Sequence, residues 1–180
     1  MKSKDQEIIE ITIKWIKEDG YETVSLRKLA QELNITAPAI YKHFRNKDEL
    51  LAAATRQLST RFISNLHLDS KLSAEEKLLV IAQLFCRKFE EETNLMDFLF
   101  FNSHALSVLQ PQSENKYPFL KEVKKLVHEA NMSNTPDAEL FIKLWSFIQG
   151  YALLIKNHVV KYQSDLVESS LKQLLGEKEE

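Results

Sequence analysis

The chain has 180 residues, of which 44% are hydrophobic, and its formal net charge is −2 at pH 7. It is long and apolar enough to bury a core, either as one compact unit or as a small head on a larger body. The single cysteine, Cys86, excludes an internal disulfide and fits a buried thiol in a reducing compartment. No signal peptide is visible, and the most apolar stretch, Leu95–Leu109, is too short and too interrupted by polar residues to span a bilayer. We therefore expect a cytoplasmic protein with no membrane partner.

Helical spacing of apolar residues runs almost from one end of the chain to the other. Only 3 Gly and 4 Pro interrupt it, and the alternation typical of strands is scarce. The pattern predicts an all-α fold of about nine helices. We expect a three-helix head in residues 1–50 and a larger helical body in residues 51–180.

Residues 25–51 are the most informative part of the chain, because they predict two short helices joined by a tight turn and then a third. Ser25 is a candidate N-cap, and apolar residues recur at helical spacing to Leu33. Asn34 tolerates the left-handed conformation that ends a helix, and Thr36 is the next candidate N-cap. A helix-turn-helix of this shape places its second helix in the major groove of DNA.

The helix that starts after Thr36 has two unlike faces. Ala37, Ile40 and Phe44 are expected to pack inward, and the opposite side and its flanks carry Pro38, Ala39, Tyr41, Lys42, His43 and Arg45. A Tyr hydroxyl, an ammonium and an imidazole can each donate to phosphate oxygens, while Ala37 and Pro38 are small enough to let the helix approach base edges. This face is typical of a recognition helix.

A third helix follows at Asn46, which is a candidate N-cap with Glu49 at the third helical position. Lys47 would lie where its ammonium and the positive end of that helix can both face a phosphate.

Charge is distributed unevenly along the chain. Seven basic residues stand against three acidic ones between Thr23 and Arg61, so this segment carries +4 and the remainder −6. The distribution favours a DNA-reading head on a body that does not adhere to phosphate.

The order of these residues resembles the tetracycline-repressor (TetR) family of bacterial transcriptional regulators. The resemblance covers Ile8–Leu51 and rests on three motifs: Gly20-Tyr21 after a first amphipathic helix, Ser25-Leu26-Arg27-Lys28-Leu29-Ala30, and Ile40-Tyr41-Lys42-His43-Phe44 followed by Asn46-Lys47-Asp48-Glu49-Leu50-Leu51. It implies a homodimeric regulator of transcription that binds a double-stranded, pseudo-palindromic DNA operator, and it implies repression.

Carried over position by position, the family's DNA contacts fall on nine residues: Ser25, Arg27, Thr36, Ala37, Pro38, Tyr41, Lys42, His43 and Lys47. Two positions depart from the common pattern. Asn34 stands in the turn where many relatives have Gly, and Pro38 replaces a Gly or a small polar residue. The base preference at Pro38 cannot be copied from any relative. Taken singly, each polar residue of this set could equally be an ordinary surface side chain.

The body should contain five further helices after the one that starts at Lys47 and runs to about Leu66. Their expected ranges are Ser73 to Glu92, with a Ser73–Glu76 capping box, Leu95 to Leu109, Tyr117-Pro118 to Ala130, Thr135-Pro136-Asp137 to Tyr162, and 164–175.

The helix of residues 136–162 is apolar on more than one face, so it must be covered on both sides. The helix of residues 164–175 carries a narrow apolar stripe: Leu166, Val167, Ser170, Leu171, Leu174 and Leu175. We expect these two helices to form a homodimer interface, as in the resembled family; the alternative is that both faces are covered within one chain.

An aromatic region of the body is a candidate site for a small hydrophobic effector that releases the protein from DNA. Its candidate lining residues are Phe85, Phe89, Phe101, His104, Trp145 and Gln149, although aromatic residues at helical spacing are more often plain core. The five His residues show no spacing typical of metal ligands, and we expect no metal and no cofactor.

Three other functions are alternatives to a regulator. An enzyme is disfavoured because no phosphate-binding Gly-rich loop and no nucleophile motif is present. A TetR-like DNA-binding structural or assembly factor without an effector remains the main alternative. A helical adaptor with no nucleic-acid role is disfavoured by the +4 head.

Overall fold

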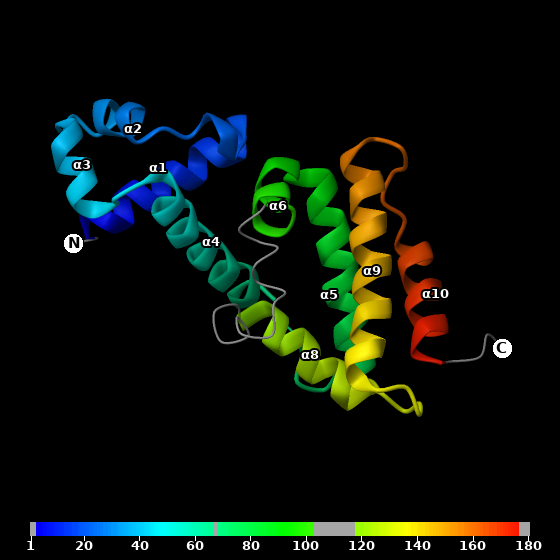
Figure 1. The fold of residues 1–180 in the computed structure, drawn as a ribbon. Coiled ribbons are helices and arrows are strands. Elements are labelled where there is room, and N and C mark those ends of the chain that lie inside the picture. Colours follow the sequence, from blue (N-terminus) through cyan, green and yellow to red (C-terminus); the bar gives the residue numbers. More distant parts are fainter. Residues whose placement is uncertain (1–2, 67, 103–117, 177–180) are drawn as a thin grey trace. The chain divides into compact units, whose positions relative to one another are not determined.

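A computed structural model describes residues 3–66, 68–102 and 118–176 of the chain (Figure 1). Within these residues the protein contains nine α-helices, one short 3-10 helix and no strand, which confirms the all-α prediction. Backbone contacts divide the chain into two compact units, residues 1–63 with 92–117 and residues 64–91 with 118–180. The expected boundary between a head and a body after residue 50 stays a prediction.

The N-terminal unit contains α1 (Lys4–Asp19), the 3-10 helix η1 (Tyr21–Thr23), α2 (Leu26–Glu32), α3 (Ala37–His43), α4 (Lys47–Ser64) and α6 (Thr93–Phe100). Helix α1 begins where the Ser3 hydroxyl accepts a hydrogen bond from the backbone N–H of Gln6. It ends at Gly20, whose φ of +83° favours glycine and whose N–H donates to the carbonyl of Ile16.

The core of this unit is made by one apolar face from each helix. Its fully buried members include Ile8 and Ile16 of α1, Leu29 of α2, Ile40 of α3, Leu50 and Ala54 of α4 and Phe98 of α6. Because α3 contributes so little to this core, the other faces of that helix remain at the surface.

Helix α6 is attached to the C-terminal end of α1. The Lys17 ammonium lies 2.9 Å from the carboxylate of Glu92, and the Asn94 amide donates to the carbonyls of Lys17 and Glu18 at 3.2 and 3.3 Å. The Phe98 ring lies against the Tyr21 ring with a centroid separation of 5.6 Å. These contacts satisfy carbonyls that the end of α1 leaves without helical partners.

The second unit contains α5 (Ala74–Glu91), α8 (Pro118–Ala130), α9 (Asp137–Lys156) and α10 (Ser164–Leu175), which pack side by side (Figure 1). The capping box predicted at the start of α5 is confirmed: the Glu76 N–H donates to the Ser73 hydroxyl at 3.1 Å, and the Ser73 N–H donates to the Glu76 carboxylate at 2.7 Å. The Tyr151 hydroxyl of α9 donates to the carbonyl of Lys161 and accepts from the N–H of Gln163, which fixes the chain as it enters α10.

Helix α9 ends six residues earlier than the sequence analysis predicted. It stops at Lys156, because His158 takes a left-handed φ of +58° that a helix cannot continue. The residues up to Tyr162 therefore form a turn and a connection. At its start, Pro136 occupies the N-cap position, and the Pro136 carbonyl accepts from the N–H groups of Glu139 and Leu140.

Helix α6 is also shorter than the helix predicted for Leu95–Leu109. It starts at Thr93 and ends at Phe100, and the buried Asn102 amide donates to the carbonyl of Phe98 in the last turn. That side-chain bond replaces a helical backbone bond. The remainder of the predicted helix lies outside the described residues.

By length and composition, α9 is apolar enough to cross a membrane, which the sequence analysis did not find for this segment. A third of its most apolar window is buried within the protein. Within the second unit, α9 packs against α5, α8 and α10.

Candidate nucleic-acid interface and apolar pocket

Helices α2 and α3 form the predicted helix-turn-helix. The turn between them is closed by backbone bonds, from the N–H of Asn34 to the carbonyl of Gln31 and from the N–H of Ile35 to the carbonyl of Ala30. Asn34 takes the predicted left-handed conformation, with a φ of +53°. Thr36 is the N-cap of α3, and its hydroxyl accepts from the N–H of Ala39 at 3.3 Å. Ser25 is the N-cap residue of α2, but its side chain makes no capping bond.

The side of α3 that faces away from the core carries most of the predicted DNA contacts. Ile40 and Phe44 are buried as predicted, while Tyr41 is 45% exposed. Exposed around Tyr41 are Thr36, Ala37, Pro38, Lys42 and Arg45, and Arg27 of α2 is exposed as well. Ser25 is half-buried. The exposed set combines a phenol, three cations and small residues, which is the chemistry that phosphate and base contacts require.

The inward position predicted for Ala37 is wrong. Ala37 is exposed, because α3 begins there and the helix turns its side chains into the core only from Ile40 onward. Its exposure is compatible with the other role predicted for it, close approach to a base edge.

His43 and Lys47, the last two predicted DNA contacts, each have a partner within the protein. His43 is the last residue of α3, and its Nδ1 lies 2.6 Å from Oδ1 of Asp5 in the first turn of α1. The Lys47 ammonium donates to the backbone carbonyl of Glu22 at 2.8 Å, so it fastens η1 to the start of α4. The sequence analysis found neither Asp5 nor Glu22, because both are distant in sequence from their partners.

The start of α4 has the predicted cap. The Asn46 side chain accepts from the N–H of Glu49 at 2.8 Å, and the Glu49 carboxylate accepts from the N–H of Arg45 at 2.8 Å. These two bonds hold the backbone of the segment that leaves α3, including Arg45, at the start of α4.

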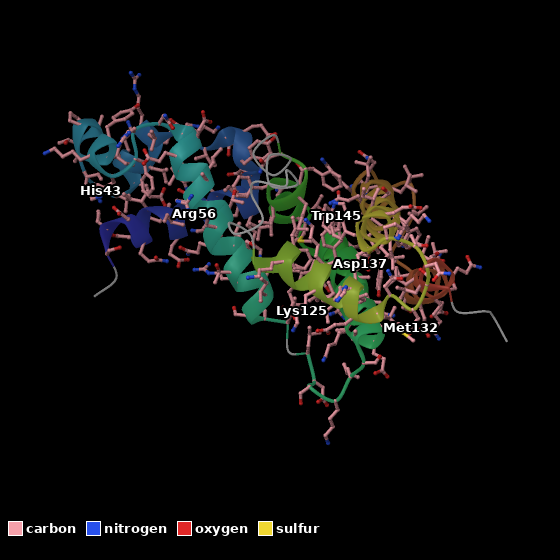
Figure 2. All side chains as sticks on the ribbon, turned by 60° about the horizontal axis from the view of Figure 1, so that its bottom comes forward. His43, Arg56, Lys125, Met132, Asp137 and Trp145 are labelled. Atoms are coloured by element: carbon pink, nitrogen blue, oxygen red, sulfur yellow. The ribbon has the colours of Figure 1, made fainter. Side chains whose placement is uncertain are left out.

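The second unit contains an apolar pocket that is partly open to solvent. It lies among α5, α8, α9 and α10, and its lining residues are Leu78, Ile81, Ala82, Phe85, Phe119, Val123, Val127, Phe141, Leu144, Trp145, Ile148 and Leu171. Aromatic rings make up one side: Phe141 stacks on Trp145 at 5.9 Å, and Trp145 also lies 5.7 Å from Phe85. Figure 2 shows Trp145 on α9. The pocket suits an aliphatic or aromatic group.

Of the six residues predicted to line a pocket, the structure brings two to it, Phe85 and Trp145. Phe89 is fully buried and contacts Phe85, with ring centroids 5.1 Å apart, but it does not line the space. Gln149 does not line it either, and Phe101 belongs to the other unit. His104 lies outside the described residues.

The wall of the pocket formed by α8 was missed in the sequence analysis. Phe119, Val123 and Val127 recur there at helical spacing, which marks an apolar face, but spacing alone does not tell which helix that face meets. Within the described part of the chain, no three His, Cys, Asp or Glu side chains are grouped as a metal site requires.

Comparisons with known proteins agree with this geometry. The family model for the tetR family of bacterial regulatory proteins matches residues 8–54. The fatty acid metabolism regulator protein of Bacillus subtilis (strain 168) is 32% identical over 85 residues, 46% of this chain and 44% of that protein. The nicotine-responsive transcriptional repressor HdnoR of Paenarthrobacter nicotinovorans is 36% identical over 61 residues, 34% of this chain and 31% of that protein. The match thus spans less than half the length of either relative.

Solved structures share the fold over nearly the whole chain. FadR from Bacillus subtilis, in complex with stearoyl-CoA, superposes with a TM-score of 0.69 at 19% identity, covering 96% of this chain and 98% of that one. BioQ with its double-stranded DNA operator gives a TM-score of 0.66 at 16% identity, covering 97% and 99%. Residues 8–54 thus match the helix-turn-helix domain of the tetR family of bacterial regulatory proteins, and the described helices share the fold of these solved structures.

Proposed function

We propose that this protein is a dimeric, DNA-binding repressor of transcription, released from a pseudo-palindromic operator by an amphipathic effector with a hydrophobic chain. The observation that carries the proposal is the exposed face of α3, where Tyr41 and Lys42 stand at the surface of a helix anchored by Ile40 and by the Thr36 cap. The exposed Arg45 follows shortly after the end of this helix. Such a face is presented to the major groove by helix-turn-helix proteins. BioQ, which has this fold, was solved on its DNA operator.

The DNA-contacting residues follow from the same face. Thr36, Ala37, Pro38, Tyr41, Lys42 and His43 would lie at or in the groove, with Ser25, Arg27 and Lys47 at flanking phosphates. Phosphate contacts of this kind make the affinity fall with added salt, because releasing condensed counterions into a more concentrated solution gains less entropy.

The apolar pocket supports an effector over a purely structural DNA-binding role. Its lining is aliphatic and aromatic throughout, as is typical of sites that bind a hydrophobic small molecule. One relative is named for fatty acid metabolism, and FadR was solved with stearoyl-CoA. A fatty acyl chain has the shape and polarity to occupy a space between four helices, so an acyl thioester or a fatty acid is the first effector to try.

A homodimer is supported by apolar side chains that the second unit leaves exposed. On α9 they are Ile142, Leu153 and Leu154, with the small Ser146 and Gly150 on the same side of the helix; Val159 and Val160 follow it and Leu166 is on α10. A Cβ at Gly150 would meet no atom within 4 Å, so a second helix can approach closely there. Val167, Leu171 and Leu175 of the predicted α10 stripe are instead buried within the chain.

No enzymatic role is proposed, and the cytoplasm, where bacterial DNA lies, is the expected site of action. The test is to capture host genomic fragments with the purified protein and sequence them, with the double variant Tyr41→Ala, Lys42→Ala as control. One palindromic motif that the variant fails to recover supports the proposal. No enrichment at low salt, or equal enrichment by the variant, contradicts it.

A further inference from the structure

We propose that Asp5 is a positioning residue for DNA recognition: it fixes the proton on Nδ1 of His43 and thereby makes the contact of His43 with DNA depend on protonation of the ring. The inference rests on the proposed DNA-binding function. Its structural basis is the 2.6 Å separation between Asp5 Oδ1 and His43 Nδ1, which joins the first turn of α1 to the last residue of α3.

The hydrogen-bonding capacity of the two groups fixes which of them donates. An ionised carboxylate can only accept, so Nδ1 of His43 must donate across the 2.6 Å contact. A neutral imidazole carries one N–H, and with that proton on Nδ1 the other nitrogen, Nε2, is an acceptor. Neutral His43 held by Asp5 therefore has no ring N–H left to donate to DNA.

A phosphate oxygen accepts hydrogen bonds and cannot donate them. His43 can contact phosphate through its ring only after Nε2 also gains a proton, which gives the imidazolium with both nitrogens as donors. Without Asp5 the restriction disappears, because a neutral ring can place its proton on Nε2. The contact with Asp5 thus converts His43 from a donor available at any pH into one that requires acid.

Other charged groups near His43 act in known directions. Lys42 and Arg45, its neighbours along the chain, are cations that oppose a charge on the ring. Lys4 and Glu7, on the same turn of α1 as Asp5, pair with each other at 2.9 Å. From α4, the Glu49 carboxylate is engaged with the backbone N–H of Arg45. Asp5 is the carboxylate in contact with the ring.

The tautomer can be measured without DNA. Long-range proton–nitrogen NMR spectra of the full chain at pH 8.5 distinguish a ring with its proton on Nδ1 from one with its proton on Nε2. For the wild-type protein we expect the His43 signals of the Nδ1–H form, and for Asp5→Ala those of the Nε2–H form. An Nε2–H ring in the wild-type protein overturns the proposal, whatever the protein binds.

Operator affinity then tests the consequence, by fluorescence anisotropy from pH 8.0 to 5.5 at constant ionic strength with the recovered operator duplex. For the wild type we expect binding to tighten by about tenfold as pH falls, since a charge-assisted contact is gained. The Asp5→Ala variant should bind the operator more tightly than the wild type at pH 8.0, and its affinity should change only about twofold between pH 8.0 and 5.5. The affinity of His43→Gln should hardly change with pH.

Glu7→Ala is the matched control, because it removes a carboxylate from the same turn of α1 without touching His43. It should shift affinity equally at every pH and keep the wild-type pH profile. If Asp5→Ala keeps that profile too, or if the wild-type profile is flat, the inference is overturned while DNA binding stands. If the wild-type protein recognises no operator at any pH, the proposed function falls and this inference with it.

Discussion

Glu10 of α1 and Arg61 of α4 form an ion pair, and the same carboxylate oxygen of Glu10 accepts hydrogen bonds from two glutamine amides. Gln57 of α4 donates at 2.9 Å and Gln6 of α1 at 3.2 Å, and the Gln6 amide also donates to Gln57 at 2.7 Å. The first half of α4 is held to the unit by buried Leu50, Leu51 and Ala54, whereas these later residues are held to α1 by polar contacts. Glu10 is the common acceptor of the group.

Replacing Glu10 by Ala should lower the free energy of unfolding by about 1–2 kcal/mol, because several half-buried donors lose a charged acceptor at once. Urea denaturation followed by circular dichroism measures it. Glu7→Ala serves as the control, since it removes an exposed ion pair with Lys4, a type worth about 0–1 kcal/mol. Equal effects of the two substitutions would show that the Glu10 network adds nothing to stability.

The two N-caps of the helix-turn-helix should differ in their contribution to stability. Thr36→Ala removes the hydroxyl that accepts from the Ala39 N–H and should cost about 1 kcal/mol. Ser25→Ala removes a hydroxyl that makes no capping bond and should cost clearly less. Thermal or urea unfolding of both variants tests this difference. A larger loss for Ser25→Ala would mean that the cap of α3 is not where the structure places it.

Local signals in the sequence predicted most of the helix starts. Caps at Thr36, at Asn46 and at the Ser73–Glu76 box lie within three residues of the groups they bind, so spacing was sufficient to find them. The end of α9 was placed wrongly because no residue type forced it: His158 adopts a left-handed conformation that is more usual for Gly or Asn.

Contacts between distant segments could not be predicted in the same way. The partner of His43 lies 38 residues earlier, at Asp5, and that of Lys47 lies 25 residues earlier, at Glu22. The pocket shows the same limit. Aromatic content pointed to Phe85 and Trp145, but which side chains face the same space depends on how α8 packs on α5 and α9.

Filling the pocket should remove effector binding without unfolding the protein. Ala82 lines the space on α5, and Ala82→Leu adds three carbons to it. Stearoyl-CoA is the probe. At a free concentration of 100 times its Kd it should stabilise the wild-type protein by about 2.7 kcal/mol, so the melting temperature should rise by several degrees. The Ala82→Leu variant should show little or no rise. Differential scanning fluorimetry measures both.

Val80→Leu is the control for the pocket substitution, because Val80 is on the same helix but exposed. It should respond to stearoyl-CoA as the wild type does. If stearoyl-CoA raises the melting temperature of Ala82→Leu as much as that of the wild type, it binds outside the pocket. If it does not raise the melting temperature of the wild type, this acyl thioester is not an effector.

Charge introduced into the exposed face of α9 should separate the subunits. Leu153 is 43% exposed and Ile142 is 61% exposed, and the two share one side of the helix. Ile142→Glu combined with Leu153→Glu would bury like charges against each other in a dimer and should give a monomer by analytical ultracentrifugation. Operator affinity should fall at least 100-fold, because one half-site remains engaged. Val80→Glu, at an exposed position of α5, should leave the oligomeric state and the operator affinity unchanged. If the double variant still sediments as a dimer, the dimer interface does not include this face of α9.

The thiol of Cys86 should be unreactive in the folded protein. Its side chain is fully buried on α5, and burial raises its pKa to about 12. Since the thiolate is the nucleophile, the fraction able to attack a disulfide reagent at pH 8 is about 10⁻⁴ of the thiol, and the reagent must also reach it. A colorimetric thiol assay should therefore detect almost no reaction in buffer and one thiol per chain in 6 M guanidinium. At intermediate urea concentrations, the rate at which the Cys86 thiol reacts would report the opening of the second unit. A saturating effector should slow this reaction, because it stabilises the closed form. Rapid labelling in buffer alone would mean that α5 is not packed as the structure describes.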